Sequence, residues 1–156
     1  MTVKEFLDYL SQELNRSPRT VISYAEDLYA FEAYFLDKDE GLTWETIDTD
    51  IIRDWMESMV DKGNSPSSVA RRLSAVKGFF KFALAREFIS SDPAHAIRSP
   101  KRSRPLPQFL KENEINDLLD KQAWGDDFKG LRDRLIIMMF YETGVRLAEL
   151  VGMDDE

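Results

Sequence analysis

Arg146 is the side chain in this sequence best placed to act on an anion. It follows Thr143-Gly144-Val145, and the residues after it predict a helix that begins near Val145. A cation at a helix start is unfavourable unless something negative lies close by, because the helix N-terminus is itself positive. Glu149, three residues further on, can supply that charge as an ion pair, and a bound phosphate can supply it as well. The residues alone favour the ion pair and leave the phosphate open.

A second feature is a basic segment in the middle of an acidic chain. The 156 residues carry a formal net charge of −8. Residues 64–104 nevertheless hold nine Lys or Arg against two acids, and the segments on either side are both acidic. Lys and Arg bind phosphates and release counterions, so this asymmetry indicates a polyanionic partner. The alternative is a solvated helix face followed by a basic linker. The nine cations are Arg71, Arg72, Lys77, Lys81, Arg86, Arg98, Lys101, Arg102 and Arg104.

The composition excludes several kinds of chemistry. Cysteine is absent and His95 is the one histidine, so thiolate sites and multi-histidine metal sites are excluded. No apolar run approaches the roughly 20 residues that cross a bilayer. The residues after Met1 do not form a secretory signal. We therefore expect a cytoplasmic protein without membrane contact and without a metal.

Hydrophobic periodicity predicts an all-α protein, with no strand pattern of useful length. Two Ser-Pro pairs, at 17–18 and 65–66, each predict a helix cap followed by proline at the first helical position. Helices are expected over about 3–14, 18–36, 50–62 (capped by Thr49 or Asp50, with Val60 inward), 66–86, a short stretch after Asp92-Pro93, 111–121, 131–142 and 145–151.

The helix over 66–86 is predicted to have two different faces. One is a buried apolar stripe, and the other combines small residues with cations. Small side chains let a helix backbone approach a surface closely, and cations then reach past them to phosphates. This second face therefore favours a nucleic-acid partner. The stripe is Val69, Leu73, Val76, Phe80 and Leu84, and the second face is Ser67, Arg71, Ser74, Gly78 and Lys81.

Residues 99–107 are predicted to be an extended basic linker between two domains. They hold three prolines and three basic residues, a composition typical of a domain boundary. The predicted organisation is a domain over 1–98, the linker over 99–107, and a second domain that begins at 108 and extends to 156.

Beyond these patterns, the chain resembles the tyrosine recombinase, or phage integrase, family. Tyr141 to Leu150 (YETGVRLAEL) is similar to that family's first arginine box. Ser17 to Phe31 resembles the second helix of its core-binding domain, and Arg72 to Phe80 resembles its DNA-facing helix. Asp92-Pro93-Ala94 and Ser99-Pro100-Lys101 match as well. The boxes occur in the right order over essentially the whole chain. Because no arm-binding module precedes them, the chain most resembles the Xer-type members.

The resemblance implies a SAM-like core-binding bundle of four to five helices, a basic linker and the truncated helical start of a catalytic domain. In this family the two domains clamp a DNA duplex. The implied reaction is strand exchange through a covalent 3′-phosphotyrosyl intermediate, with no metal and no nucleotide cofactor. Of the catalytic set only the first arginine maps here, onto Arg146. It would stabilise charge on the scissile phosphate, with Glu149 as its orienting residue.

The rest of the implied catalytic set has no match in these residues. His95 to Arg98 has the His-x-x-Arg spacing but precedes Arg146, so we interpret it as coincidence. All five tyrosines also precede Arg146, whereas the family's nucleophile follows it. A covalent mechanism cannot run without its nucleophile. We therefore expect the N-terminal part of a longer recombinase, which binds DNA and by itself cleaves nothing. Whether it counts as an enzyme stays open.

The resemblance also predicts which residues contact DNA. The second and fourth helices would meet adjacent major-groove surfaces, and the linker would follow the backbone. Most contacts would go to phosphates, with Arg71 or Arg72 the better candidates for reading base edges. The predicted contacts are Arg19, Thr20, Ser23, Ser65, Ser67, Ser68, Arg71, Arg72, Ser74, Lys77, Lys101, Arg102 and Arg104.

Two other classes of function stay in view. One is a stand-alone helical DNA-binding regulator, which would have no use for the arginine box at Arg146. The other is a helical protein-interaction module that would use the acidic first helix or the Trp44 and Trp55 region. The expected partners are double-stranded DNA and, in the family's full-length tetramers, other recombinase protomers. The 156 residues by themselves are expected to be largely monomeric.

Overall fold

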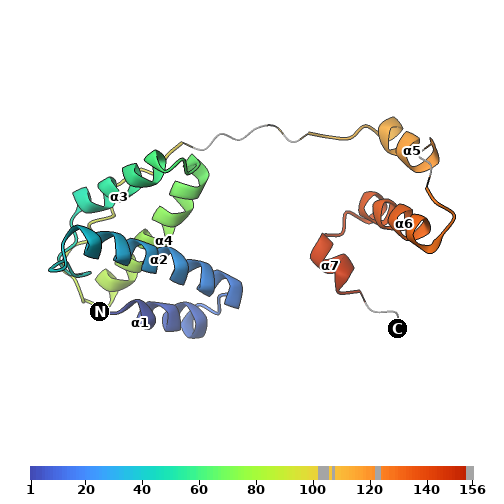
Figure 1. Cartoon of the computed structure of the whole chain (residues 1–156). Coiled ribbons are helices and arrows are strands. Elements are labelled where there is room, and N and C mark those ends of the chain that lie inside the picture. The colour runs from blue at the N-terminus through green and yellow to red at the C-terminus, as the bar shows by residue number, and fades with distance from the viewer. Residues whose placement is uncertain (102–105, 107, 122–123, 154–156) are drawn as a thin grey trace. The chain divides into compact units, whose positions relative to one another are not determined.

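The structure, a computed structural model, describes residues 1–101, 106, 108–121 and 124–153, and they contain helices and no strands. The chain divides into two compact units, Met1–Arg104 and Pro105–Glu156. The all-α prediction is confirmed. Figure 1 shows the helices, which are α1 (Val3–Asp8, continued by a π-helical turn at Tyr9–Glu13), α2 (Pro18–Lys38), α3 (Thr49–Asp61), α4 (Pro66–Ala85), α5 (Glu112–Lys121), α6 (Phe128–Thr143) and α7 (Leu147–Val151).

The helices of the first unit begin at side-chain caps. The Ser17 and Ser65 hydroxyls accept hydrogen bonds from the backbone N–H three residues on, at 3.3 Å and 3.2 Å. Each satisfies a donor that the helix itself leaves unpaired. The cap of α3 is Asp48, one residue before the range the sequence predicted, because its carboxylate accepts from the N–H groups of both Asp50 and Ile51. The two Ser-Pro helix starts are confirmed.

The cap at Ser65 gives a stability prediction. Ser65→Ala removes the acceptor for the Ser68 N–H, and we expect the free energy of unfolding to fall by about 1 kcal/mol. Ser67→Ala is the matched control, since Ser67 lies in the first turn of the same helix, is exposed and caps nothing. Its effect should stay within about 0.5 kcal/mol. Urea denaturation followed by circular dichroism measures both, and equal effects would contradict the role of the cap.

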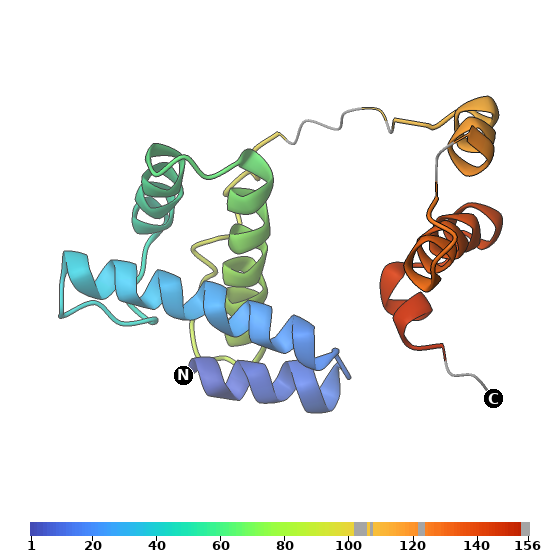
Figure 2. The ribbon, with the colours of Figure 1, turned by 45° about the vertical axis from the view of Figure 1, so that its right-hand side comes forward.

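The core of the first unit is aromatic and lies where α2, α3 and α4 meet. Trp44, on the connection between α2 and α3, packs against Phe79 of α4 with ring centroids 4.3 Å apart. Phe31 of α2 lies 4.7 Å from Trp55 of α3 and 5.6 Å from Trp44. Figures 1 and 2 show α2 crossing α4, with α1 beside α2. The four rings are all at most 6% exposed, so they tie the three helices into one body.

α4 is buried on more of its surface than a single stripe predicts. Besides four predicted stripe residues, it buries three alanines and two further phenylalanines, because the other helices pack around it. Leu84 was predicted to be buried and is 41% exposed, since it lies in the last turn beyond that packing. Val60, predicted inward, is 57% exposed. The predicted short helix after Pro93 is a turn, in which the Ala94 N–H donates to Asp92 Oδ1 at 2.8 Å.

The second unit has the predicted helices but little core. Ile115 of α5 is buried, and α6 has no buried residue. α6 ends at Gly144, whose φ of +64° is readily available to glycine. Several large apolar side chains of this unit are at least 50% exposed: Leu106, Phe109, Leu110, Phe128, Leu131, Leu135, Leu147, Val151 and Met153.

Candidate nucleic-acid interface

An open groove between α2 and α4 gathers six of the predicted contact residues. Its volume is about 550 Å³. Arg19, Thr20 and Ser23 reach it from α2, and Ser67, Arg71 and Ser74 reach it from α4. The remaining lining residues are Ser17, Tyr24 and Asp27. Two segments about 50 residues apart in the sequence therefore form one surface, which is lined mainly by small hydroxyl side chains and two arginines.

Helical spacing explains why these side chains meet. Thr20, Ser23 and Asp27 recur at intervals of three and four residues, so they share one face of α2. Ser67, Arg71 and Ser74 do the same on α4. On α4 the apolar residues of the core lie on the opposite face, whereas on α2 the buried Leu28 and Phe31 adjoin Asp27 at the inner edge of the polar face. Packing of the core therefore places the two polar faces along the same groove.

The strongest contact in the groove joins Arg71 to Asp27. Arg71 Nη1 donates to Asp27 Oδ2 at 2.5 Å, and Nη2 donates to Oδ1 at 2.9 Å. Nη1 also donates to Ser23 Oγ at 2.9 Å. The Asp27 side chain is only 5% exposed, whereas that of Arg71 is 51% exposed. The carboxylate of the pair is therefore buried on α2, and the guanidinium is accessible from the groove.

Arg72 lies on the same carboxylate by a weaker contact. Its Nε is 3.8 Å from Asp27 Oδ1, is buried and has no hydrogen-bond partner. Its Nη1 lies 3.7 Å from the Met59 sulfur. Burial raises the pKa of the Asp27 carboxyl above its usual value, and the charges of Arg71 and Arg72 oppose that rise. Asp27 thus faces two guanidinium groups, and a single carboxylate neutralises only part of their charge.

The other predicted contacts of the first unit lie outside this groove lining. Lys77 is half-buried, and its Nζ donates to the Ile97 carbonyl at 2.5 Å. The Ser65 and Ser68 hydroxyls are 3.0 Å apart at the start of α4. Lys101 is exposed. Arg102 and Arg104 lie outside the described residues.

Arg146 is the N-cap of α7, as its predicted position at a helix start implies. Its backbone N–H donates to Glu149 Oε2 at 2.8 Å, and its Nη1 donates to Glu149 Oε1 at 3.0 Å. The Arg146 side chain is 83% exposed. The ion pair that the residues favoured is thus present, and the guanidinium keeps most of its surface available to a second anion.

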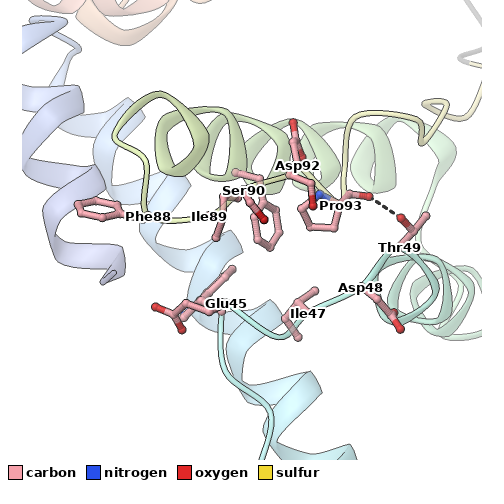
Figure 3. Close-up of a pocket in the computed structure, with 12 residues that line it drawn as sticks. Glu45, Ile47, Asp48, Thr49, Phe88, Ile89, Ser90, Asp92 and Pro93 are labelled. Carbon is pink, nitrogen blue, oxygen red and sulfur yellow. Dashed lines mark hydrogen bonds between the residues drawn. The ribbon is translucent and has the colours of Figure 1, made fainter.

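A second depression has the opposite electrostatic character. It lies between residues 44–49 and 88–93, has a volume of about 490 Å³ and is shown in Figure 3. Glu45, Asp48 and Asp92 line it, and no cation does among the residues that form it. Thr49 Oγ1 donates to the Pro93 carbonyl at 2.8 Å and joins its two walls. Carboxylates repel phosphate, so this depression is a poor candidate for nucleic acid.

Sequence reasoning missed the importance of Asp27. The available signal was its place on α2 beside Leu28 and Phe31, where a charged side chain is unusual because burial of an unpaired charge is unfavourable. An acid at such a position indicates a buried partner. The sequence could not indicate which cation that was, because Arg71 lies 44 residues away.

Comparisons with known proteins identify the family. Residues 3–87 match the model of the phage integrase N-terminal SAM-like domain, and the chain belongs to that family. A tyrosine recombinase XerC of Natranaerobius thermophilus is 39% identical over 150 residues, 96% of this chain and 50% of the relative. A tyrosine recombinase XerD of Oceanobacillus iheyensis is 28% identical over 97% of this chain and 50% of the relative. The chain spans about half the length of these relatives.

A solved structure has the same fold. The lambda integrase dimer bound to a COC′ core site superimposes with a TM-score of 0.65 and 22% identity, over 99% of this chain and 42% of that one. Within the part of the chain that the structure describes, no helix is long and apolar enough to cross a membrane. No group of three or more potential metal-ligating side chains occurs among the same residues.

Proposed function

We propose that this chain binds duplex DNA, as the N-terminal part of a site-specific tyrosine recombinase. The observation that carries the proposal is the groove between α2 and α4, where six predicted contact residues line one surface. The names of the relatives, XerC and XerD tyrosine recombinases, support it. The lambda integrase dimer, which has the same fold and is bound to a core site, supports it as well. A stand-alone regulator is less favoured, since it would not need Arg146.

The proposed contacts divide by chemistry. Arg19 is exposed at the start of α2 and is suited to a phosphate. The hydroxyls of Thr20, Ser23, Ser67 and Ser74 are small enough to let the two helix backbones approach the duplex. Ser65 and Ser68 lie at the positive start of α4, where phosphate binding is favourable. Along the linker, Lys101, Arg102 and Arg104 would follow the DNA backbone.

The proposed role of Arg146 belongs to the recombinase as a whole. There it would bind the scissile phosphate and stabilise charge in the transition state, held in place by Glu149. A guanidinium can bind two phosphate oxygens at once, which an ammonium cannot. For these 156 residues themselves we propose DNA binding, and we assign strand cleavage to the recombinase as a whole. Other recombinase protomers, in a tetramer on DNA, are the proposed protein partners, and the 156 residues alone would be largely monomeric.

Chemical-shift mapping tests the assigned face. A 20-bp mixed-sequence duplex is titrated into the ¹⁵N-labelled chain, and the backbone amides are followed. We expect the largest shifts at residues 17–27 and 65–74, with small ones at the acidic depression of residues 44–49 and 88–93. Largest shifts at the acidic depression would contradict the assigned face, and no shifts anywhere would contradict DNA binding.

Two lysines give a matched prediction. Lys101→Ala removes an exposed cation that we assign to a phosphate, so the slope of log K against log salt should become less steep by about one. Lys77→Ala removes the same charge, but its ammonium already binds the Ile97 carbonyl. We expect its slope to change by less than about half of that. Fluorescence anisotropy at several salt concentrations measures both, and equal slopes for the two variants would contradict this assignment.

A further inference from the structure

The donors of Arg71 are divided between the protein and the open groove. A guanidinium has five N–H donors in a fixed plane. Asp27 accepts from one N–H of Nη1 and one of Nη2, and Ser23 accepts from Nη1. What is left is the Nε–H and the second N–H of Nη2. These two N–H groups are parallel on the Nε–Nη2 edge of the guanidinium, so together they can bind two acceptor atoms at once.

The buried carboxylate of Asp27 holds the Arg71 guanidinium in place. Asp27 is 4% exposed, is fixed on α2 and faces Arg71 from the inner side of the groove. The second guanidinium, that of Arg72, lies 3.8 Å from one of its oxygens. The side chain of Arg71 is half exposed, so its remaining edge can reach the groove. The ion pair thus fixes the guanidinium of Arg71 and leaves its Nε–Nη2 edge accessible from the groove.

We propose that Asp27 is a positioning residue, which fixes Arg71 so that its Nε–Nη2 edge binds a pair of acceptor atoms on duplex DNA. This inference rests on the proposed function and adds a role for Asp27, which is not among the predicted DNA contacts. The acceptor pair is either two phosphate oxygens or O6 and N7 of a guanine, since both fit a bidentate guanidinium. Asp27 itself touches no DNA in this arrangement.

The proposal predicts a result opposite in sign to simple electrostatics. If Asp27 acted only as a negative charge near DNA, Asp27→Asn would strengthen binding, because it removes repulsion from phosphates. If Asp27 positions Arg71, the same change frees a long side chain that DNA must then order. Ordering one such side chain weakens binding by about threefold to tenfold. The two accounts therefore differ in direction.

A double-mutant cycle separates them. Binding of the full chain to a 30-bp mixed-sequence duplex is measured for wild type, Asp27→Asn, Arg71→Ala and the double variant. We expect Asp27→Asn to weaken binding by about threefold to tenfold in the wild-type background and by less than about twofold when Arg71 is absent. The same change in both backgrounds, or tighter binding in the wild-type background, would overturn the proposal.

Asp54→Asn is the matched control for charge. Asp54 pairs with Lys38, at the other end of α2 from the groove, and its side chain is 50% exposed. The Asp54→Asn substitution removes the same charge without affecting Arg71, so duplex binding should stay unchanged or become slightly tighter. Weakening equal to that of Asp27→Asn would overturn the positioning role.

A second arm of the experiment identifies the acceptor atoms with a duplex of A·T pairs only. Equal affinity of wild type for both duplexes assigns the acceptors to phosphate, and loss of the Arg71→Ala effect on the A·T duplex assigns them to guanine.

A measurement on the wild type keeps the proposal testable if Asp27→Asn does not fold. The Arg71 ¹⁵Nε–H signal is followed during titration with the 30-bp duplex. We expect it to shift and to exchange more slowly with water as the acceptor pair covers it. A signal that stays unchanged at saturation would overturn the proposal. Failure of the proposed function would look different, since wild type would then not bind the duplex at all.

Discussion

Phe79→Ala is expected to lower the free energy of unfolding of the first unit by about 3–5 kcal/mol. Phe79 is fully buried in the middle of α4. Its ring lies 4.3 Å from Trp44 and 5.6 Å from Phe6, measured between centroids. Alanine would lose that burial and leave a cavity that the surrounding rings cannot fill. Single domains are stable by only about 5–15 kcal/mol, so the loss is a large share of the total.

Urea denaturation, followed by circular dichroism and tryptophan fluorescence, measures the effect. Leu84→Ala is the control, because Leu84 lies on the same helix and is 41% exposed. It removes less apolar area from the interior, and its effect should stay below about 1.5 kcal/mol. If the two substitutions destabilised the chain equally, burial of the Phe79 ring would not be what stabilises the core.

Replacing both Arg19 and Arg71 with alanine is expected to weaken duplex binding by about 10-fold to 100-fold. These are the two cations that line the groove between α2 and α4. Each loses a contact to the duplex, and where both contacts go to phosphates the slope of log K against log salt should become less steep by about two. Fluorescence anisotropy with a labelled 30-bp duplex gives the affinity and the slope in one series.

A second pair of cations provides the control for net charge. Lys38 and Arg53 are exposed and pair with Asp54 and Asp50, away from the groove. Lys38→Ala combined with Arg53→Ala removes the same charge and should change affinity by less than about threefold. An equal loss for the two double variants would mean that net charge, and not the groove, determines binding.

Much of the fold could be predicted because its signals are local. Ser17-Pro18 and Ser65-Pro66 define two helix starts by cap chemistry alone, and the structure has both. The spacing of Ser67, Arg71 and Ser74 put them on one face of a helix, and they do line one groove. The position of Arg146 at a helix start, with Glu149 as its partner, was equally local.

What could not be predicted depends on packing between distant residues. The stripe assigned to α4 was too narrow, because helices on several sides of α4 bury its alanines as well. Leu84 has the right spacing but lies beyond the reach of those neighbours. The pairing of Asp27 with Arg71 joins two helices, and no periodicity within either one indicates it. It is this pairing that decides which edge of Arg71 faces the groove.

The salt dependence of duplex binding by the wild-type chain tests the central claim most directly. The affinity for a 30-bp duplex is measured at several KCl concentrations from about 50 to about 200 mM. A groove and linker that neutralise about four or five phosphates predict a straight line of log K against log salt, with a slope of about −4. A chain of net charge −8 that bound through anything other than a local cationic surface would lack that steep loss. A flat line, or no binding at the lowest salt concentration, would contradict the account.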